Sequence, residues 1–216
     1  KKVFIQKCVD FINEKYGEGT ATLELKHQYY NMRKQVEPHY HIVEKAMKAI
    51  EAGKHVLCEK PLALNAVEAE EMFRAAKQKG VHFAEAYAYL HSPYVSSLRE
   101  VIDSGSIGEV DYIETAFVTQ GYEEDYRLHK EYGGGAMYDL GCYCTTMMLS
   151  LVDAEPDFVK ACAEFGGDDV DFHTAGIVRF ENGVRASFNV GMIFGKGANG
   201  RFDRLYIHGS KGYIRS

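Results

Sequence analysis

The sequence lacks the marks of a membrane protein and of a nucleic-acid-binding protein. No apolar run among its 216 residues approaches the ~20 residues that a membrane-spanning helix needs. Its 31 acidic and 25 basic residues give a net charge of −6, which disfavours binding to a polyanion. No signal-peptide pattern opens the chain. We therefore expect a protein without a membrane or nucleic-acid partner.

Cysteine is scarce and scattered. The five cysteines stand at positions 8, 58, 142, 144 and 162, an odd count without the spacing of a disulfide framework. This usage suits a reducing compartment and predicts a cytoplasmic location. Cys142 and Cys144 would make half of a metal site, but no second pair follows them. We interpret them as small buried residues and expect no metal.

A glycine-rich phosphate turn is missing from the first 37 residues, which read as two helices, Lys1 to Gly17 and Thr22 to Glu37. A dinucleotide-binding domain normally begins with a strand, G-x-G-x-x-G and a helix. The stretch Gly195 to Gly200 matches that motif literally, but a strand pattern follows it. Without a helix N-terminus there is no anion site, so we expect a hairpin loop there.

A helix, strand, turn and helix follow one another around Lys60. Val43 to Gly53 has helical periodicity, Val56-Leu57-Cys58 is a short apolar run, and Glu59-Lys60-Pro61 leads to a further helix. Ligands of open α/β sheets bind at the carboxyl ends of the strands, where this pattern places Lys60. Read alone, Lys60 is equally well an ordinary loop lysine.

The helix after Lys60 has clear end signals. Asn65 and Glu68 have the spacing of a capping box, and Gly80 is suited to the C-terminus. The pattern predicts that Phe73 and Ala76 face inward.

A second informative stretch runs from Gly133 to Tyr143. Three successive glycines allow a close approach of the backbone, and a helix pattern follows them. Asp139 and Tyr143 are four residues apart and so share one helical face. In isolation, this is equally a helix N-terminus that carries one acid and one tyrosine.

The remainder predicts strands over 110–119, 158–165, 174–180, 184–194 and 204–208, joined in part by tight turns such as Glu181-Asn182-Gly183. The predicted fold class is α/β (α+β). A partial Rossmann-like layer precedes a mixed, mostly antiparallel β-sheet with helices on one face.

Two of these stretches, Ala52 to Ala63 and Gly133 to Tyr143, resemble signatures of the glucose-fructose oxidoreductase / inositol dehydrogenase (Gfo/Idh/MocA) family. Members are NAD(P)-dependent oxidoreductases of sugars and polyols. The resemblance implies a hydride transfer between NAD or NADP and a hydroxyl carbon. It also implies that Lys60, Asp139 and Tyr143 are catalytic, with Tyr143 exchanging the proton at a pKa lowered by Lys60.

The same resemblance implies binding residues. Glu59, Lys60 and Pro61, together with the turn Pro38-His39, would bind the cofactor. Arg127 and His129 would bind the substrate, although a solvated loop is an equal reading of both. The side chains of Tyr87 and Tyr89 are predicted to point outward at the end of a strand, where Tyr87 would line the substrate pocket. The alternative is that both are ordinary aromatic residues on the surface.

The sequence departs from the family pattern at two places. Ile42 stands where the family often has histidine, and Leu90 stands where it often has arginine. The resemblance to the family begins at Pro38 and does not include the G-x-G-x-x-G part. We therefore expect residues 1–216 alone to bind NAD(P) weakly or not at all, because much of the affinity for a dinucleotide comes from its pyrophosphate.

The resemblance implies two domains. Residues 1–89 would be a partial nucleotide-binding domain, of which 1–37 remain an unassigned helical segment, and residues 90–216 a domain for substrate binding and oligomerisation. Members of the family often bury the open face of this sheet against a second subunit, so the resemblance implies a homo-oligomer, and the alternating apolar residues in Val184 to Val190 are consistent with such a face. The alternative function is a cofactor-less remnant that serves as a binding or dimerising module.

Overall fold

The computed structural model describes residues 10, 13–15, 17, 42–195 and 200–216. The chain divides into two units, residues 1–38 and residues 39–216. In the first unit, Asp10 and residues 13–15 have helical backbone, and the Gly17 N–H donates to the Asn13 carbonyl at 2.9 Å. The helix predicted over 22–37 and the cofactor-binding prediction for Pro38 and His39 lie outside the described residues.

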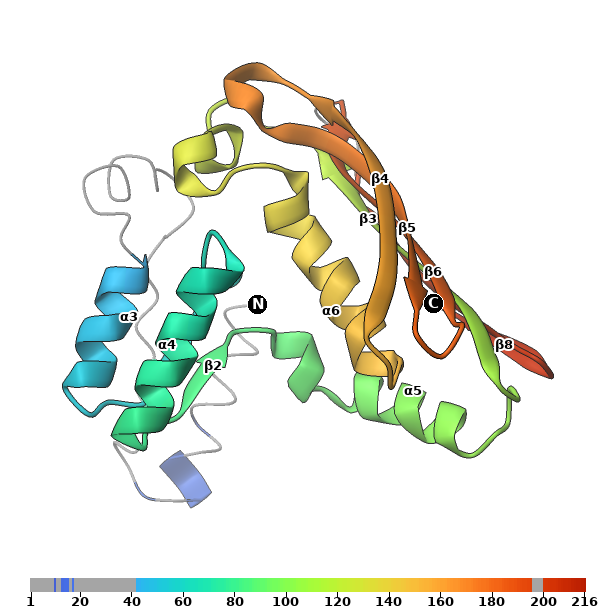
Figure 1. Ribbon diagram of the computed structural model, residues 1–216, viewed down its shortest axis with the longest axis horizontal. Coiled ribbons are helices and arrows are strands. Elements are labelled where there is room, and N and C mark those ends of the chain that lie inside the picture. The colour runs from blue at the N-terminus through green and yellow to red at the C-terminus, as the bar shows by residue number, and fades with distance from the viewer. Residues whose placement is uncertain (1–9, 11–12, 16, 18–41, 196–199) are drawn as a thin grey trace. The chain divides into compact units, whose positions relative to one another are not determined.

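The second unit begins with a small α/β layer. Helix α3 (Ile42–Glu51) leads to strand β1 (Val56–Cys58), and helix α4 (Ala66–Lys79) leads to strand β2 (Phe83–Glu85). The two strands pair in parallel, with Cys58 opposite Glu85, and the two helices pack side by side (Figure 1). The helix–strand–helix pattern around Lys60 is therefore confirmed.

The ends of α4 follow the predicted chemistry. The Asn65 side chain accepts the Glu68 N–H at 3.0 Å, and Gly80 adopts the left-handed conformation with φ of 65°. The Glu68 carboxylate accepts the N–H of Leu64 at 3.0 Å, one residue before the cap. The Asn65 side chain and the Glu68 carboxylate thus accept hydrogen bonds from backbone N–H groups that have no partner within the helix.

The predicted inward face of α4 is half wrong. Ala76 is buried, but Phe73 is 48% exposed and Met72 is fully buried in its place. Met72 and Ala76 are four residues apart and therefore share a face, whereas Phe73 is rotated to the side, where its ring packs edge-on against Phe83.

The chain then enters its larger sheet. A 3₁₀ turn, η1 (Ala88–His91), and helix α5 (Pro93–Asp103) precede strand β3 (Val110–Gln120). Ser92 stands at the N-cap of α5, but its hydroxyl donates to the Tyr89 carbonyl at 2.7 Å and makes no hydrogen bond with the backbone amides of the helix.

Six strands form this sheet in the order β4-β5-β6-β3-β7-β8. The further strands are β4 (Pro156–Phe165), β5 (Asp171–Phe180), β6 (Arg185–Phe194), β7 (Phe202–Gly209) and β8 (Gly212–Arg215). Only the β3–β6 pair is parallel; the other four pairings are antiparallel. The predicted mixed, mostly antiparallel sheet is confirmed.

The hairpin predicted for Gly195 to Gly200 is wrong. Strands β6 and β7 each pair with β3, which lies between them, so the segment joins strands that are not neighbours. Residues 196–199 themselves are not described. The next element is still the strand β7, so the literal G-x-G-x-x-G match is not followed by a helix N-terminus.

Helix α6 (Cys142–Leu151), preceded by a π-helical turn, η4 (Met137–Gly141), packs on β3 and β6 (Figure 1). The apolar positions of β6, Ala186, Phe188 and Val190, are buried in this core. These apolar side chains therefore face the helix. The interpretation of Val184 to Val190 as a sheet face that a second subunit covers is wrong.

No helix among the described residues is long and apolar enough to cross a membrane.

Candidate active site

Lys60 lies in a turn that is tied to the neighbouring strand. The turn follows β1, and the N–H of Leu62 donates to the Glu85 carboxylate at 3.0 Å. Glu85 ends β2 directly opposite Cys58, and the Ala86 N–H donates to the Cys58 carbonyl at 2.8 Å. The lysine is thus held at the carboxyl edge of two parallel strands, the edge at which α/β sheets bind ligands.

The ammonium of Lys60 binds Asp139 twice. Its Nζ lies 3.0 Å from Asp139 Oδ1 and 2.7 Å from the Asp139 carbonyl oxygen. Only 13% of the Lys60 side chain and 8% of the Asp139 side chain are exposed. Burial lowers the pKa of Lys60, but the charge and hydrogen bond of Asp139 outweigh it, so that the pKa is raised. Lys60 is therefore a cation at neutral pH.

Arg127 approaches the same carboxylate from the other side. Its Nε lies 2.8 Å from Asp139 Oδ2, as an ion pair whose N–H does not point at the oxygen, and its Nη1 lies 3.0 Å from Asp125 Oδ1. The guanidinium stacks on the rings of Tyr122 and Tyr126, at 5.0 and 4.6 Å. Asp139 thus joins two cations in one network.

Tyr143 lies beneath the lysine in an aromatic cluster. The Lys60 Nζ is 4.7 Å from the centre of its ring, a cation–π distance. The rings of Tyr87, Tyr89 and Phe117 surround it at 5.6, 5.9 and 5.8 Å. The structure therefore brings the three predicted catalytic residues, Lys60, Asp139 and Tyr143, to one place.

The expected direction of the Tyr143 pKa is wrong. Lys60 does lower the pKa of this phenol, but burial raises it more, and the net pKa lies above the ordinary value. The half-buried aromatic surroundings penalise the phenolate more than one ammonium above the ring stabilises it. Tyr143 therefore holds its proton at neutral pH.

Tyr87 does not point outward. It is 6% exposed, because the segment after β2 turns into the 3₁₀ helix η1 instead of continuing as a strand. Its ring packs edge-on against Tyr143, and burial raises its pKa. The assignment of Tyr87 to substrate binding stays a prediction.

The other predicted binding residues border the network. The imidazole of His129 lies 3.4 Å from Asp168 Oδ2, and its ring packs against Tyr132. Glu59 is exposed, and its carboxylate accepts the Lys60 backbone N–H at 3.3 Å. Pro61 forms the turn between Lys60 and Leu62, and its peptide bond with Lys60 is cis.

Two carboxylates that support the site were missed. Glu85 holds the Lys60 turn, and the buried Asp171 accepts the N–H of Met137 at 3.0 Å, at the start of the helix that carries Asp139. Glu85 is the last residue of β2 and Asp171 the first of β5, so a carboxylate at the end of a strand is the signal that could have indicated them. A Cβ on Gly135 would lie 2.2 Å from Asp171 Oδ1, which explains one of the three glycines.

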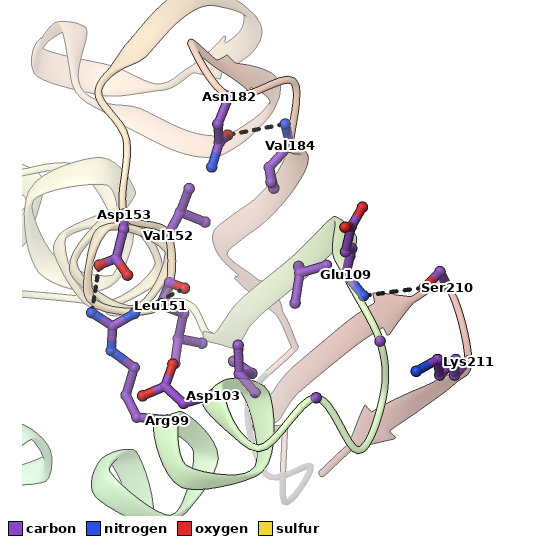
Figure 2. Close-up of a pocket in the computed structure, with 14 residues that line it drawn as sticks. Arg99, Asp103, Glu109, Leu151, Val152, Asp153, Asn182, Val184, Ser210 and Lys211 are labelled. Atoms are coloured by element: carbon purple, nitrogen blue, oxygen red, sulfur yellow. Dashed lines mark hydrogen bonds and ion pairs between the residues drawn. The ribbon is translucent and has the colours of Figure 1, made fainter.

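A hollow of about 580 Å³ lies elsewhere (Figure 2). It is lined by the ends of α5 and α6 and by the turns at Asn182 and Ser210. Arg99 in its wall is paired with Asp153 at 2.6 Å. Because the hollow contains none of the residues of the Lys60 network, we place the candidate site at the network, where cationic, acidic and phenolic groups converge.

Within the part of the chain that the structure describes, no group of three histidine, cysteine, aspartate or glutamate side chains could hold a metal ion.

Comparisons with known proteins match two family models. Residues 95–215 match the GFO/IDH/MocA C-terminal domain, and residues 35–87 match an oxidoreductase family described as an NAD-binding Rossmann fold.

Named relatives and solved structures agree with these models. The chain is 32% identical over 170 residues to a trans-1,2-dihydrobenzene-1,2-diol dehydrogenase of Xenopus laevis, covering 78% of this chain and 50% of the relative. It is 32% identical over 147 residues to a dTDP-3,4-didehydro-2,6-dideoxy-alpha-D-glucose 3-reductase of Actinomadura kijaniata, covering 67% and 44%. A levoglucosan dehydrogenase in complex with NADH matches with a TM-score of 0.72 and 29% identity, over 81% of this chain and 50% of that one. The chain thus spans about half the length of these relatives.

Proposed function

The chain belongs to the Gfo/Idh/MocA family of oxidoreductases, and we propose that it carries the substrate side of an NAD(P)-dependent dehydrogenase. The reaction is a hydride transfer between the nicotinamide and a hydroxyl carbon of a sugar, polyol or cyclic alcohol. The names of the relatives, which include a diol dehydrogenase, a sugar reductase and an anhydrosugar dehydrogenase, support this class of substrate.

The observation that carries the proposal is the Lys60–Asp139 contact. Two N–H groups of the Lys60 ammonium are directed at Asp139, and an ammonium has three donors. The third is available for the oxygen of the reacting carbon, where it would stabilise developing negative charge. Because the pKa of Lys60 is raised, this charge is present over the whole neutral range.

Tyr143 is the proposed proton-exchanging group. Its raised pKa keeps the hydroxyl protonated, which suits proton donation to the oxygen of a carbonyl substrate. In the direction of alcohol oxidation, the same residue accepts the proton as a phenolate, which needs higher pH. Asp139 touches Lys60 and Arg127 and in this proposal orients Lys60.

The residues present fit the nicotinamide side of a cofactor. Lys60 and Pro61 form a turn at the carboxyl edge of a parallel β-strand pair, and Glu59 borders it. The bound nicotinamide supplies the hydride chemistry. We propose that Glu59, Lys60 and Pro61 border it, together with Pro38 and His39, and that NAD or NADP is the cofactor.

Arg127, His129 and Tyr87 are the proposed substrate residues. The two cations Lys60 and Arg127 are matched by Asp139 and Asp125. A site whose charges are balanced in this way suits an uncharged polyhydroxy substrate better than an acid, because an anion would find no unmatched cation.

We further propose the division into a nucleotide-binding part, 1–89, and a part for substrate binding and oligomerisation, 90–216; the two matched ranges support it. A homo-oligomer is supported by exposed apolar residues on the sheet, such as Phe158, Ile177 and Tyr213. A reducing, cytoplasmic location is supported by the free cysteines of the described residues, Cys58, Cys142, Cys144 and Cys162.

The competing function, a cofactor-less binding module, has no support among the relatives, whose names are those of dehydrogenases and reductases.

A substrate screen tests the proposal. The full-length natural protein is incubated with NAD or NADP and a panel of aldoses, anhydrosugars, inositols and diols, and the absorbance of the reduced cofactor is followed. We expect turnover with at least one polyhydroxy compound. Absence of turnover with the whole panel, in both directions and with both cofactors, contradicts the proposal.

A further inference from the structure

The turn that joins β4 to β5, residues 166–171 and here called the clamp turn, has an uncommon backbone. Asp168 and Asp169 are adjacent and both left-handed, with φ of 60° and 54°. A residue with a Cβ adopts this region at a cost, and aspartate is among the few that tolerate it. Two successive aspartates in this conformation indicate that the backbone of the turn is set so as to direct their carboxylates to particular partners.

The carboxylates of the clamp turn reach two backbone amides. Asp168 Oδ2 accepts the N–H of Lys130 at 3.0 Å. Asp171 Oδ2 accepts the N–H of Met137 at 3.0 Å and a hydrogen bond from the Thr174 hydroxyl at 2.6 Å. One turn therefore holds both ends of the glycine segment 130–137.

The glycine segment is in turn bonded to the residues of the candidate site. The N–H groups of Gly134 and Gly135 donate to the carbonyls of His129 and Arg127, at 3.0 and 2.8 Å. The N–H of Asp139 donates to the Gly135 carbonyl at 3.1 Å. Whatever fixes this segment thus fixes the backbone of Arg127 and of Asp139, whose side chains meet at 2.8 Å.

We propose that Asp168 and Asp171 are positioning residues, which clamp both ends of segment 130–137 and so set the place of Asp139 and Arg127 against Lys60. Neither contacts Lys60 or Tyr143 among the described residues, so both reach these two residues through the segment. Asp168 Oδ2 also lies 3.4 Å from the imidazole of His129, which precedes the segment. The effect on turnover rests on the proposed function; the effect on the segment does not.

The decisive variant is Asp168→Gly. Glycine takes the left-handed conformation without steric cost, so a role limited to the backbone of the turn predicts unchanged activity and unchanged exchange in segment 130–137. The clamp predicts that loss of the Lys130 hydrogen bond loosens segment 130–137 and lowers kcat by about tenfold, the factor that a slight displacement of the charged groups readily costs. KM should rise at most modestly, through the lost contact between Asp168 and the proposed substrate residue His129, so the fall in kcat is the diagnostic quantity.

Asp168→Asn is the matched rescue. Asparagine tolerates the left-handed backbone and keeps a side-chain oxygen that accepts the Lys130 N–H. We therefore expect kcat to stay within about twofold of the wild type, a loss of less than about 0.5 kcal/mol in transition-state stabilisation. Asp157→Asn is the control for charge on the same hairpin, since Asp157 pairs with Arg179 far along β4; it should leave kcat unchanged.

Hydrogen–deuterium exchange on the full-length protein provides the readout that is independent of activity. Asp168→Gly and Asp171→Ala, which both remove the acceptor oxygen, should speed exchange in peptides that cover 130–139 and leave β1 and β2 unchanged. Faster exchange with lower kcat supports the proposal. Wild-type exchange in 130–139, or wild-type kcat in Asp168→Gly, overturns it. A wild-type protein without turnover contradicts the proposed function alone, and the exchange still tests the clamp.

Discussion

The ammonium of Lys60 and the carboxylate of Asp139 form an ion pair of 3.0 Å between residues that are 79 positions apart in the chain. The pair joins the turn after β1 to the helix start that follows the glycine segment. Because both side chains are nearly buried, removal of Asp139 leaves the Lys60 ammonium as an uncompensated charge, which costs several kcal/mol in typical cases, whereas removal of Lys60 leaves Asp139 paired with Arg127.

Asp139→Asn should lower the pKa of Lys60. The carboxylate raises this pKa against the effect of burial; without it, burial remains and the pKa falls below the ordinary value of 10.5. Lys60 then loses its charge at lower pH, so the alkaline limb of the kcat profile should move to lower pH. Asp125→Asn, which spares the contact with Lys60, is the control. If the alkaline limb of the kcat profile stays in place in Asp139→Asn, the ion pair is not the cause of the raised pKa of Lys60.

Tyr143→Phe should remove a pH dependence as well as rate. The pKa of Tyr143 is raised, so the phenol is protonated at neutral pH and the phenolate fraction grows as the pH rises. Oxidation of an alcohol by the wild type should therefore accelerate with alkaline pH, and carbonyl reduction should slow there. In the Phe variant both slopes should flatten and kcat should fall by about 10²-fold or more. Parallel pH–rate curves for variant and wild type would exclude Tyr143 as the proton-exchanging group.

Gly135→Ala should destabilise the fold. Gly135 has φ of 109°, and an added Cβ would lie 2.2 Å from the Asp171 carboxylate. The strain and overlap together should cost at least about 2 kcal/mol in the free energy of unfolding. Gly167→Ala is the matched control, because a Cβ there meets nothing within 4 Å. Denaturant titration of both variants checks the difference; equal midpoints would refute it.

Arg127→Lys should not be conservative. The guanidinium contacts Asp139 and Asp125 and stacks on Tyr122 and Tyr126, a planar geometry that an ammonium does not reproduce. We expect kcat/KM to fall by about tenfold or more, in line with the 1.5–3 kcal/mol of a hydrogen bond to a charged group. A kinetic comparison of the two proteins on one substrate measures this; equal kcat/KM would show that only the positive charge matters.

Local patterns predicted the elements around Lys60 and the mixed sheet. Periodicity and end signals act within a few residues, and Asn65, Gly80 and the β-strand alternation all belong to that range. The convergence of Lys60, Asp139 and Tyr143 followed from motif resemblance and topology, because spacing alone does not relate residues 79 positions apart.

Long-range arrangement accounts for the errors. The pairing of β6 with β3 rather than β7 made Gly195 to Gly200 a connection between strands that are not neighbours. The pKa of Tyr143 depends on the aromatic rings of Tyr87, Tyr89 and Phe117, which come from distant positions, and burial by them outweighs the nearby cation. Such competition between burial and charge is set by tertiary packing.

The measurement that tests the account most directly is the effect of Lys60→Ala on the full-length protein, with kcat and the cofactor dissociation constant determined side by side. If the Lys60 ammonium stabilises the oxygen of the reacting carbon, kcat falls by about 10²-fold or more, while the cofactor dissociation constant changes by less than about threefold, since little uniform binding is lost. A kcat close to that of the wild type, or a loss confined to cofactor affinity, would contradict the central role of Lys60.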